Sequence, residues 1–124
     1  MAALERVFIG LAGLYGAAGV GLAAAAAHLA PGSSLDSAAL MALVHAPAML
    51  ATLAAIYGGV LNRRFGLMGL ACFALGVALF SGDISTRVFT GHPLFPMAAP
   101  SGGMVLIGGW LILALSAFVA RLSR

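Results

Sequence analysis

Four long runs of apolar residues, separated by short polar interruptions, dominate the pattern of this chain. They extend over about residues 7–28, 37–61, 65–89 and 100–120. Each run has the roughly 20 residues that an α-helix needs to cross about 30 Å of hydrocarbon. None shows the two-residue alternation of a membrane β-strand. The pattern therefore predicts an all-α, integral membrane four-helix bundle, antiparallel because the connections are short.

Turn-forming residues explain the breaks between the runs. Pro31 and Gly32 predict the end of the first helix, and residues 33–36 offer serine and aspartate caps for the second. We expect a tight turn at residues 62–64, which read Asn-Arg-Arg. The last connection is rich in proline, and Pro100 suits the first turn of the final helix.

Composition supports a single domain that is solvated by lipid. The 124 residues are 63% hydrophobic and only 7% charged, against roughly 25% charged in soluble domains. A soluble protein of this size would need far more polar side chains to cover its surface. The positive charges are scattered, which argues against a nucleic-acid interface. The single cysteine, Cys72, excludes an intrachain disulfide and a cysteine-based zinc site, and we expect it to be a small packing residue.

The arginines predict an orientation in the membrane. With four spans, both termini and the second turn lie on one side. That side collects five of the six arginines, namely Arg6, Arg63, Arg64, Arg121 and Arg124, whereas Arg87 lies on the other. Because cytoplasmic segments of membrane proteins are enriched in Lys and Arg, we expect both termini in the cytoplasm.

Small residues recur within the runs at spacings that favour close helix packing in lipid. The first run has glycines at intervals of three, the third has a small pair four residues apart, and the fourth has two adjacent glycines. We predict helix contacts at Gly10, Gly13, Gly16, Gly19, Ala78, Gly82, Gly102 and Gly103. The same surfaces suggest a homo-oligomer or a larger membrane complex, with membrane lipid as the other partner.

Ionisable residues inside a span are costly and therefore face the bundle interior or a partner. His45 lies about eight residues into the second run, and Asp83 about six residues from the outer end of the third, so a His45–Asp83 contact is geometrically possible. Arg87, one turn from Asp83, can pair with it. Pro47 should kink the second helix. We predict an outer-leaflet polar cluster of His45, Asp83 and Arg87, which either staples helices or forms a proton relay or ligand site.

The sequence has little support for a haem site or for a known catalytic motif. His28 and His45 on neighbouring helices suggest haem ligands, but their different depths oppose that arrangement. There is no phosphate-binding glycine loop with lysine, no HExxH and no nucleophile elbow. We therefore expect no catalytic residues, no metal and no cofactor.

The order of several short motifs resembles a known family. These are Ala27-His28, His45-Ala46, Phe80-Ser81-Gly82, Thr90-Gly91, Pro100 with Gly102 and Gly103, and Gly109-Trp110. Together they are similar to the small membrane proteins catalogued as domain of unknown function 423, related to transmembrane protein 256 of eukaryotes. The chain departs from the family pattern after Phe80-Ser81-Gly82, where it has Asp83, Ile84 and Ser85, and is thus a divergent member. The resemblance implies four helices in a bacterial inner membrane and no established activity.

Two functional hypotheses follow. The first is a non-catalytic membrane protein that acts by packing, as an accessory, assembly or lipid-organising subunit. The second is a minimal transporter or proton-linked channel that uses His45, Asp83 and Arg87. An enzyme ranks third, because no catalytic constellation is recognisable.

Overall fold

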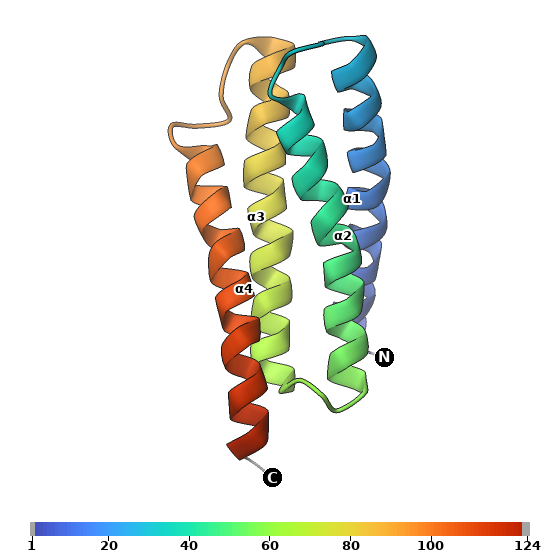
Figure 1. Ribbon diagram of the computed structural model, residues 1–124, viewed down its shortest axis with the longest axis vertical. Helices are drawn as coiled ribbons and strands as arrows, with labels where there is room; N and C mark the ends of the chain where they lie inside the picture. Colours follow the sequence, from blue (N-terminus) through green and yellow to red (C-terminus); the bar gives the residue numbers. More distant parts are fainter. Residues whose placement is uncertain (1, 123–124) are drawn as a thin grey trace.

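The computed structural model describes residues 2–122 and consists of four antiparallel α-helices. They are α1 (Ala3–His28), α2 (Leu35–Tyr57), α3 (Arg63–Thr90) and α4 (Ala98–Leu122). Figure 1 shows an up-and-down arrangement in which the start of α1 and the end of α4 lie at the same end of the bundle as the α2–α3 turn. The predicted all-α bundle is confirmed. Arg124, which the orientation argument used, lies outside the described residues, as does the side chain of Arg121.

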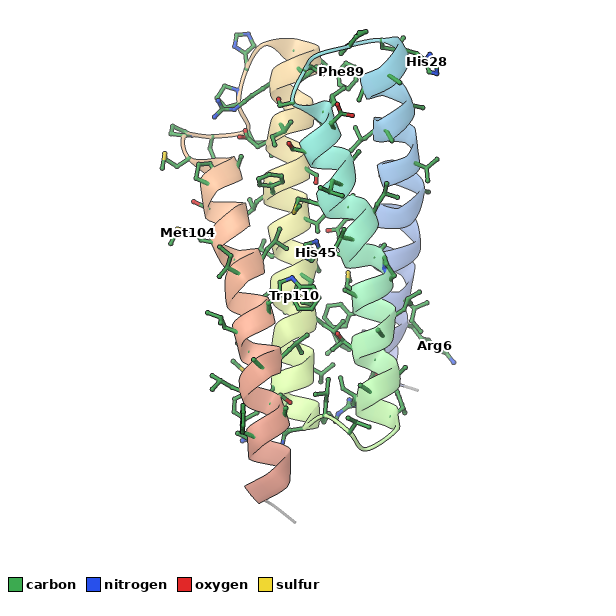
Figure 2. The ribbon with its side chains drawn as sticks, in the orientation of Figure 1. Arg6, His28, His45, Phe89, Met104 and Trp110 are labelled. Carbon is green, nitrogen blue, oxygen red and sulfur yellow. The ribbon has the colours of Figure 1, made fainter. Side chains whose placement is uncertain are left out.

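All four helices are long and apolar enough to span a membrane. Large apolar side chains are well exposed along them, for example Leu14 (66%), Met104 (73%) and Phe118 (66%). Figure 2 shows Met104 pointing away from the bundle. Such a surface is costly in water but matches a hydrocarbon solvent.

The helix ends have local causes. Ser33 Oγ accepts a hydrogen bond from Leu35 N (3.4 Å) at the start of α2, and Asn62 Oδ1 caps α3. α2 ends at Tyr57, four residues before the predicted end, because Gly59 adopts a positive φ of 72°. The turn therefore occupies residues 58–62 instead of the predicted 62–64.

The helices pack as two pairs joined through α2 and α3. α1 packs along α2, α4 packs along α3, and α2 packs on α3. In the described part of the chain, no Cα atom of α4 comes within 8 Å of α1 or α2. Between the pairs lies an apolar core that includes Phe8, Met49, Leu70, Phe73 and Val77. Within the described residues, the side of α1 that carries Gly10, Gly13 and Gly21 faces no other helix.

Pro47 lies inside α2, which remains helical on both sides of it. Figure 1 shows α2 changing direction near its middle, where this proline falls. A proline removes one backbone donor and its ring displaces the preceding turn, which accounts for a bend there.

Candidate functional site

The tightest helix contact is a glycine seam between α3 and α4. Glycines at positions 69, 76, 102 and 109 form it, spaced seven residues apart on each helix. A Cβ added to Gly102 would lie 2.6 Å from Phe80 N and 2.8 Å from Gly76 O. One added to Gly109 would lie 2.9 Å from Phe73 Cε1. The absence of side chains at these positions lets the two backbones touch.

The other predicted packing positions differ from one another. In α1, Gly19 packs tightly against Leu43 of α2, and Gly16 contacts Ala46. A Cβ added to Gly10 or Gly13, by contrast, would meet no neighbouring atom within 4 Å. These two glycines point away from α2, because intervals of three drift around a helix.

In α3 and α4, the predicted small residues beyond the seam make looser contacts. Ala78 is exposed, and a Cβ at Gly82 would meet only Leu94 of the following loop, at 3.5 Å. One at Gly103 would lie 3.8 Å from Phe80 Cδ2, an ordinary contact. Of the adjacent pair Gly102 and Gly103, only Gly102 allows close approach of the helices.

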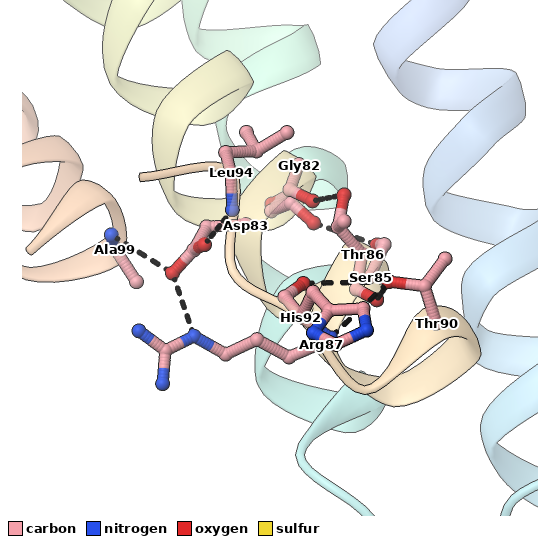
Figure 3. A network of polar contacts seen from close by, with 10 residues as sticks. Gly82, Asp83, Ser85, Thr86, Arg87, Thr90, His92, Leu94 and Ala99 are labelled. Carbon is pink, nitrogen blue, oxygen red and sulfur yellow. Dashed lines mark hydrogen bonds and ion pairs between the residues drawn. The ribbon is translucent and has the colours of Figure 1, made fainter. Parts of the chain in front are cut away.

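Asp83 organises the connection between α3 and α4 (Figure 3). Its carboxylate is fully buried and accepts three hydrogen bonds, from Leu94 N (2.8 Å), Ala99 N (3.2 Å) and Arg87 Nε (3.0 Å). Ala99 lies in the first turn of α4, so Asp83 satisfies one of its orphan amide groups. The Arg87 side chain remains half exposed. The site thus anchors the loop and the start of α4 onto α3.

His45 lies elsewhere, at the middle of the bundle. Trp110 Nε1 donates to His45 Nε2 (3.1 Å), and His45 Nδ1 bonds to the Met41 carbonyl (2.7 Å). An indole N–H only donates and a carbonyl only accepts, so the imidazole is neutral with its proton on Nδ1. Figure 2 shows His45 and Trp110 close together, and both rings also contact Phe73.

The structure therefore does not join the three predicted polar residues into one cluster. Asp83 and Arg87 pair, but His45 packs at the level of Phe73, ten residues before Asp83 on α3. That separation is about 15 Å along the helix. The reason is the register of α2 on α3. Ser81 Oγ of α3 donates to the carbonyl of Ala38 (2.7 Å), which lies two turns before His45 on α2.

The two histidines considered as haem ligands are also far apart in depth. His28 is the last residue of α1 and is exposed, whereas His45 is 3% exposed and uses both ring nitrogens in hydrogen bonds. Within residues 2–122, no group of three His, Cys, Asp or Glu side chains is arranged to hold a metal ion.

A second buried ion pair closes the opposite end of the bundle. Glu5 of α1 is fully buried and pairs with Arg63 at the start of α3, whose side chain is half exposed. The pair links two helices that otherwise approach each other over only a short stretch. It lies at the end where the two chain termini are found (Figure 1).

An apolar groove of about 430 Å³ runs between α1 and α3. Tyr15 and Leu22 line one wall, and Val77, Ser81 and Ser85 line the other. The polar groups in these walls donate to backbone carbonyls: Tyr15 Oη to Ala74 (2.5 Å), Ser81 Oγ to Ala38 and Ser85 Oγ to Ser81. The groove therefore presents mainly hydrocarbon.

Comparison with known proteins agrees with this architecture. The sequence profile described as "Protein of unknown function (DUF423)" matches residues 21–103, more than half of the chain. The chain belongs to the DUF423 family. A protein of Haemophilus influenzae described as a "UPF0382 membrane protein" is 25% identical over 72 residues, which cover 58% of each chain. The matched part thus spans less than two thirds of that relative. No solved structure matches this chain.

The DUF423 match includes His45, Asp83 and Arg87, whereas Glu5 and Trp110 lie outside it. The family membership and the four apolar helices establish a membrane protein. Neither the family's description nor that of the Haemophilus influenzae relative names a reaction, ligand or partner.

Sequence reasoning missed two partners that counting along the helices could have found. Trp110 lies twelve residues from the start of α4, close to the depth of His45, ten residues from the start of α2. Glu5 and Arg63 both lie in the first turn of their helices, which begin at the same end of an antiparallel bundle. The seven-residue spacing of Gly102 and Gly109 was a signal for the glycine seam. Residues seven apart lie on the same side of a helix, so they can face the same partner helix.

Proposed function

We propose that this DUF423 protein is a non-catalytic, multi-pass protein of the bacterial inner membrane that acts through its lateral surface, and that it pairs with a second copy through α1. The observation that carries this proposal is the outward face of α1. Gly10, Gly13 and Gly21 are exposed, and a Cβ on any of them would meet no other atom within 4 Å. With the exposed Ala17 they follow one stripe at spacings of three, four and four.

Such a stripe suits a second helix. Positions three and four residues apart lie on one face of a helix, and small side chains there allow two backbones to approach closely in lipid. Inside the chain, Gly19, Gly76, Gly102 and Gly109 already serve this purpose, since each has a neighbouring side chain or backbone at its surface. The stripe on α1 has the same composition, but its glycines meet no neighbouring helix in the part of the chain that the structure describes.

The interior supports a structural rather than a catalytic or transport role. His45 and Asp83 are buried, and their hydrogen-bonding atoms are used by Trp110, Arg87 and backbone groups. In the described part of the chain, Ser116 is the one buried polar side chain with neither a hydrogen bond nor an ion pair. On α3, the core residue Val77 lies between Phe73, at the depth of His45, and Asp83. This arrangement favours the packing hypothesis over the transporter hypothesis.

We further propose that both termini face the cytoplasm. Arg6, Arg63 and Arg64 lie at the end of the bundle that holds the chain termini, whereas Arg87 lies near the opposite end. The positive-inside rule then assigns the arginine-rich end to the cytoplasm. Membrane location itself is supported by the Haemophilus influenzae relative, which is described as a membrane protein.

Self-association is tested by replacing one outward glycine with leucine. We expect native mass spectrometry of the wild-type protein, released from lipid nanodiscs, to show a dimer. Gly13→Leu should shift it to a monomer, because the leucine side chain would hold the two α1 helices apart. Gly108→Leu is the matched control, since Gly108 lies on α4 and also has no atom within 4 Å of its Cβ position. That variant should remain dimeric.

Two outcomes would contradict the proposal. One is a wild-type protein that is strictly monomeric at its native membrane density. The other is a dimer that Gly108→Leu disrupts as strongly as Gly13→Leu, which would place the interface on α4. The orientation is tested separately. A single cysteine replaces either Arg6 or His92 in a protein that also carries Cys72→Ala, and each cysteine is labelled from outside in intact spheroplasts.

A further inference from the structure

A hollow of about 470 Å³ lies at the α2–α3 turn, at the arginine-rich end of the bundle. It is lined by Asn62, Arg63, Arg64 and Leu67. The first three residues belong to the turn and the start of α3, and Leu67 lies one turn further into the helix. α3 is apolar enough to span a membrane, so Leu67, one turn into it, would lie nearer the hydrocarbon than Arg63 and Arg64.

Among the residues that the structure describes, the positive charges in the hollow are not balanced. Arg63 pairs with the buried Glu5, and its side chain remains half exposed. Arg64 is exposed and forms no ion pair in the described part of the chain. Within residues 2–122, Glu5 is the only acidic side chain near this end and is already paired, so the described part of the hollow carries an excess of positive charge.

The Arg64, Phe65 and Gly66 amide groups at the start of α3 already have partners within the protein. Asn62 Oδ1 accepts from Arg64 N (3.0 Å) and Phe65 N (3.3 Å), and the Asn62 carbonyl accepts from Gly66 N (2.9 Å). The capping oxygen leaves the side-chain amide nitrogen of Asn62 as a donor. The side-chain donors of the hollow are the guanidinium groups of Arg63 and Arg64 and the amide of Asn62.

We propose that this hollow binds the headgroup of an anionic phospholipid. The guanidinium of Arg64 would contact the phosphate, for which its planar set of donors is well suited. Arg63 would add charge from its exposed side, and Leu67 would contact the first methylenes of an acyl chain. The excess positive charge favours a lipid with a net negative headgroup over a zwitterionic one, and anionic lipids attract basic segments at the membrane surface. The site does not depend on pairing through α1.

The test compares two arginines at the same end of the full-length protein. Phosphatidylglycerol or phosphatidylcholine is titrated into protein in a neutral detergent, and bound lipid is measured by native mass spectrometry. We expect phosphatidylglycerol to bind about tenfold more tightly than phosphatidylcholine, and Arg64→Gln to remove that preference, as expected for the loss of one charge-assisted contact. Arg6→Gln removes the same charge from α1 outside the hollow, where Figure 2 shows Arg6 pointing outward. It should leave the preference within about twofold of wild type.

Two further measurements separate the possible sources of the effect. Inorganic phosphate at millimolar concentration should not displace phosphatidylglycerol, because it lacks the chain that contacts Leu67; displacement would mean that the site takes free phosphate.

Arg64→Lys should keep most of the preference for phosphatidylglycerol over phosphatidylcholine. Equal losses in Arg64→Gln and Arg6→Gln would indicate diffuse attraction and overturn the proposal, as would equal binding of both lipids by the wild-type protein. Unchanged thermal unfolding of both glutamine variants would show that the fold is intact.

Discussion

Replacing Gly102 with alanine would force α3 and α4 apart. The new Cβ would lie 2.6 Å from the backbone nitrogen of Phe80, 2.8 Å from the carbonyl oxygen of Gly76 and 2.9 Å from Leu79 Cβ. Ordinary van der Waals contacts lie at 3.4 Å or more. Two of these atoms belong to the α3 backbone and cannot rotate away, so one helix must shift.

The size of the effect follows from two opposing contributions. Overpacking a close contact typically costs about 1–3 kcal/mol. Exchanging glycine for alanine inside a helix favours folding by about 1 kcal/mol. We therefore expect Gly102→Ala to lower the free energy of unfolding by up to about 2 kcal/mol. Gly103→Ala is the matched control, because its Cβ would meet Phe80 Cδ2 at 3.8 Å and keeps only the favourable helix contribution.

Trp110 offers a direct measurement of this difference. It is the only tryptophan, lies on α4, and contacts both His45 and Phe73. Its fluorescence during equilibrium unfolding in mixed micelles reports whether α4 is docked, and far-ultraviolet circular dichroism reports whether the helices persist. Gly102→Ala should unfold at a lower denaturant fraction than wild type, and Gly103→Ala at an equal or higher one. Equal behaviour of the two variants would refute the close approach of α3 and α4.

Two further predictions concern the buried polar groups. Asp83→Asn should speed hydrogen exchange at the Leu94 and Ala99 amides several-fold, because both amides donate to the Asp83 carboxylate in the wild-type protein. Unchanged protection of these amides would contradict the anchoring role of Asp83. Trp110→Phe should lower the free energy of unfolding by about 0.6–1.7 kcal/mol, the range for an interhelical hydrogen bond in a membrane, as followed by circular dichroism. A variant as stable as wild type would mean that the bond to His45 contributes nothing.

The placement of Asp83 changes how the α3–α4 connection should be understood. The loop, residues 91–97, contains Pro93 and Pro96 and has no helix or strand of its own, whereas Pro100 lies in the first turn of α4. The position of the loop is set by the bond from Leu94 N to Asp83 and by the start of α4 at Ala98. A buried carboxylate at the end of a span therefore has a structural reason to exist. Such groups are often considered functional first.

The register between helices was beyond the reach of sequence reasoning. His45 and Asp83 have similar distances from the ends of their own segments, which suggested that they meet. In the structure, α2 is placed so that Ala38 lies beside Ser81, and His45 consequently lies beside Phe73 and Trp110. Depth within one helix says nothing about how far that helix is shifted along its neighbour, because the shift depends on side-chain packing across the interface.

The sequence by itself determined that the chain lies in a membrane, that four helices cross it and that Arg87 can pair with Asp83. These properties depend on composition, on run length against hydrocarbon thickness and on a four-residue spacing within one helix, all of which are local. Only the tertiary structure decided which glycines touch another helix, that Glu5 meets Arg63 and that Trp110 meets His45. Those contacts join residues far apart in the chain, and they exist because rigid helices pack in one particular register.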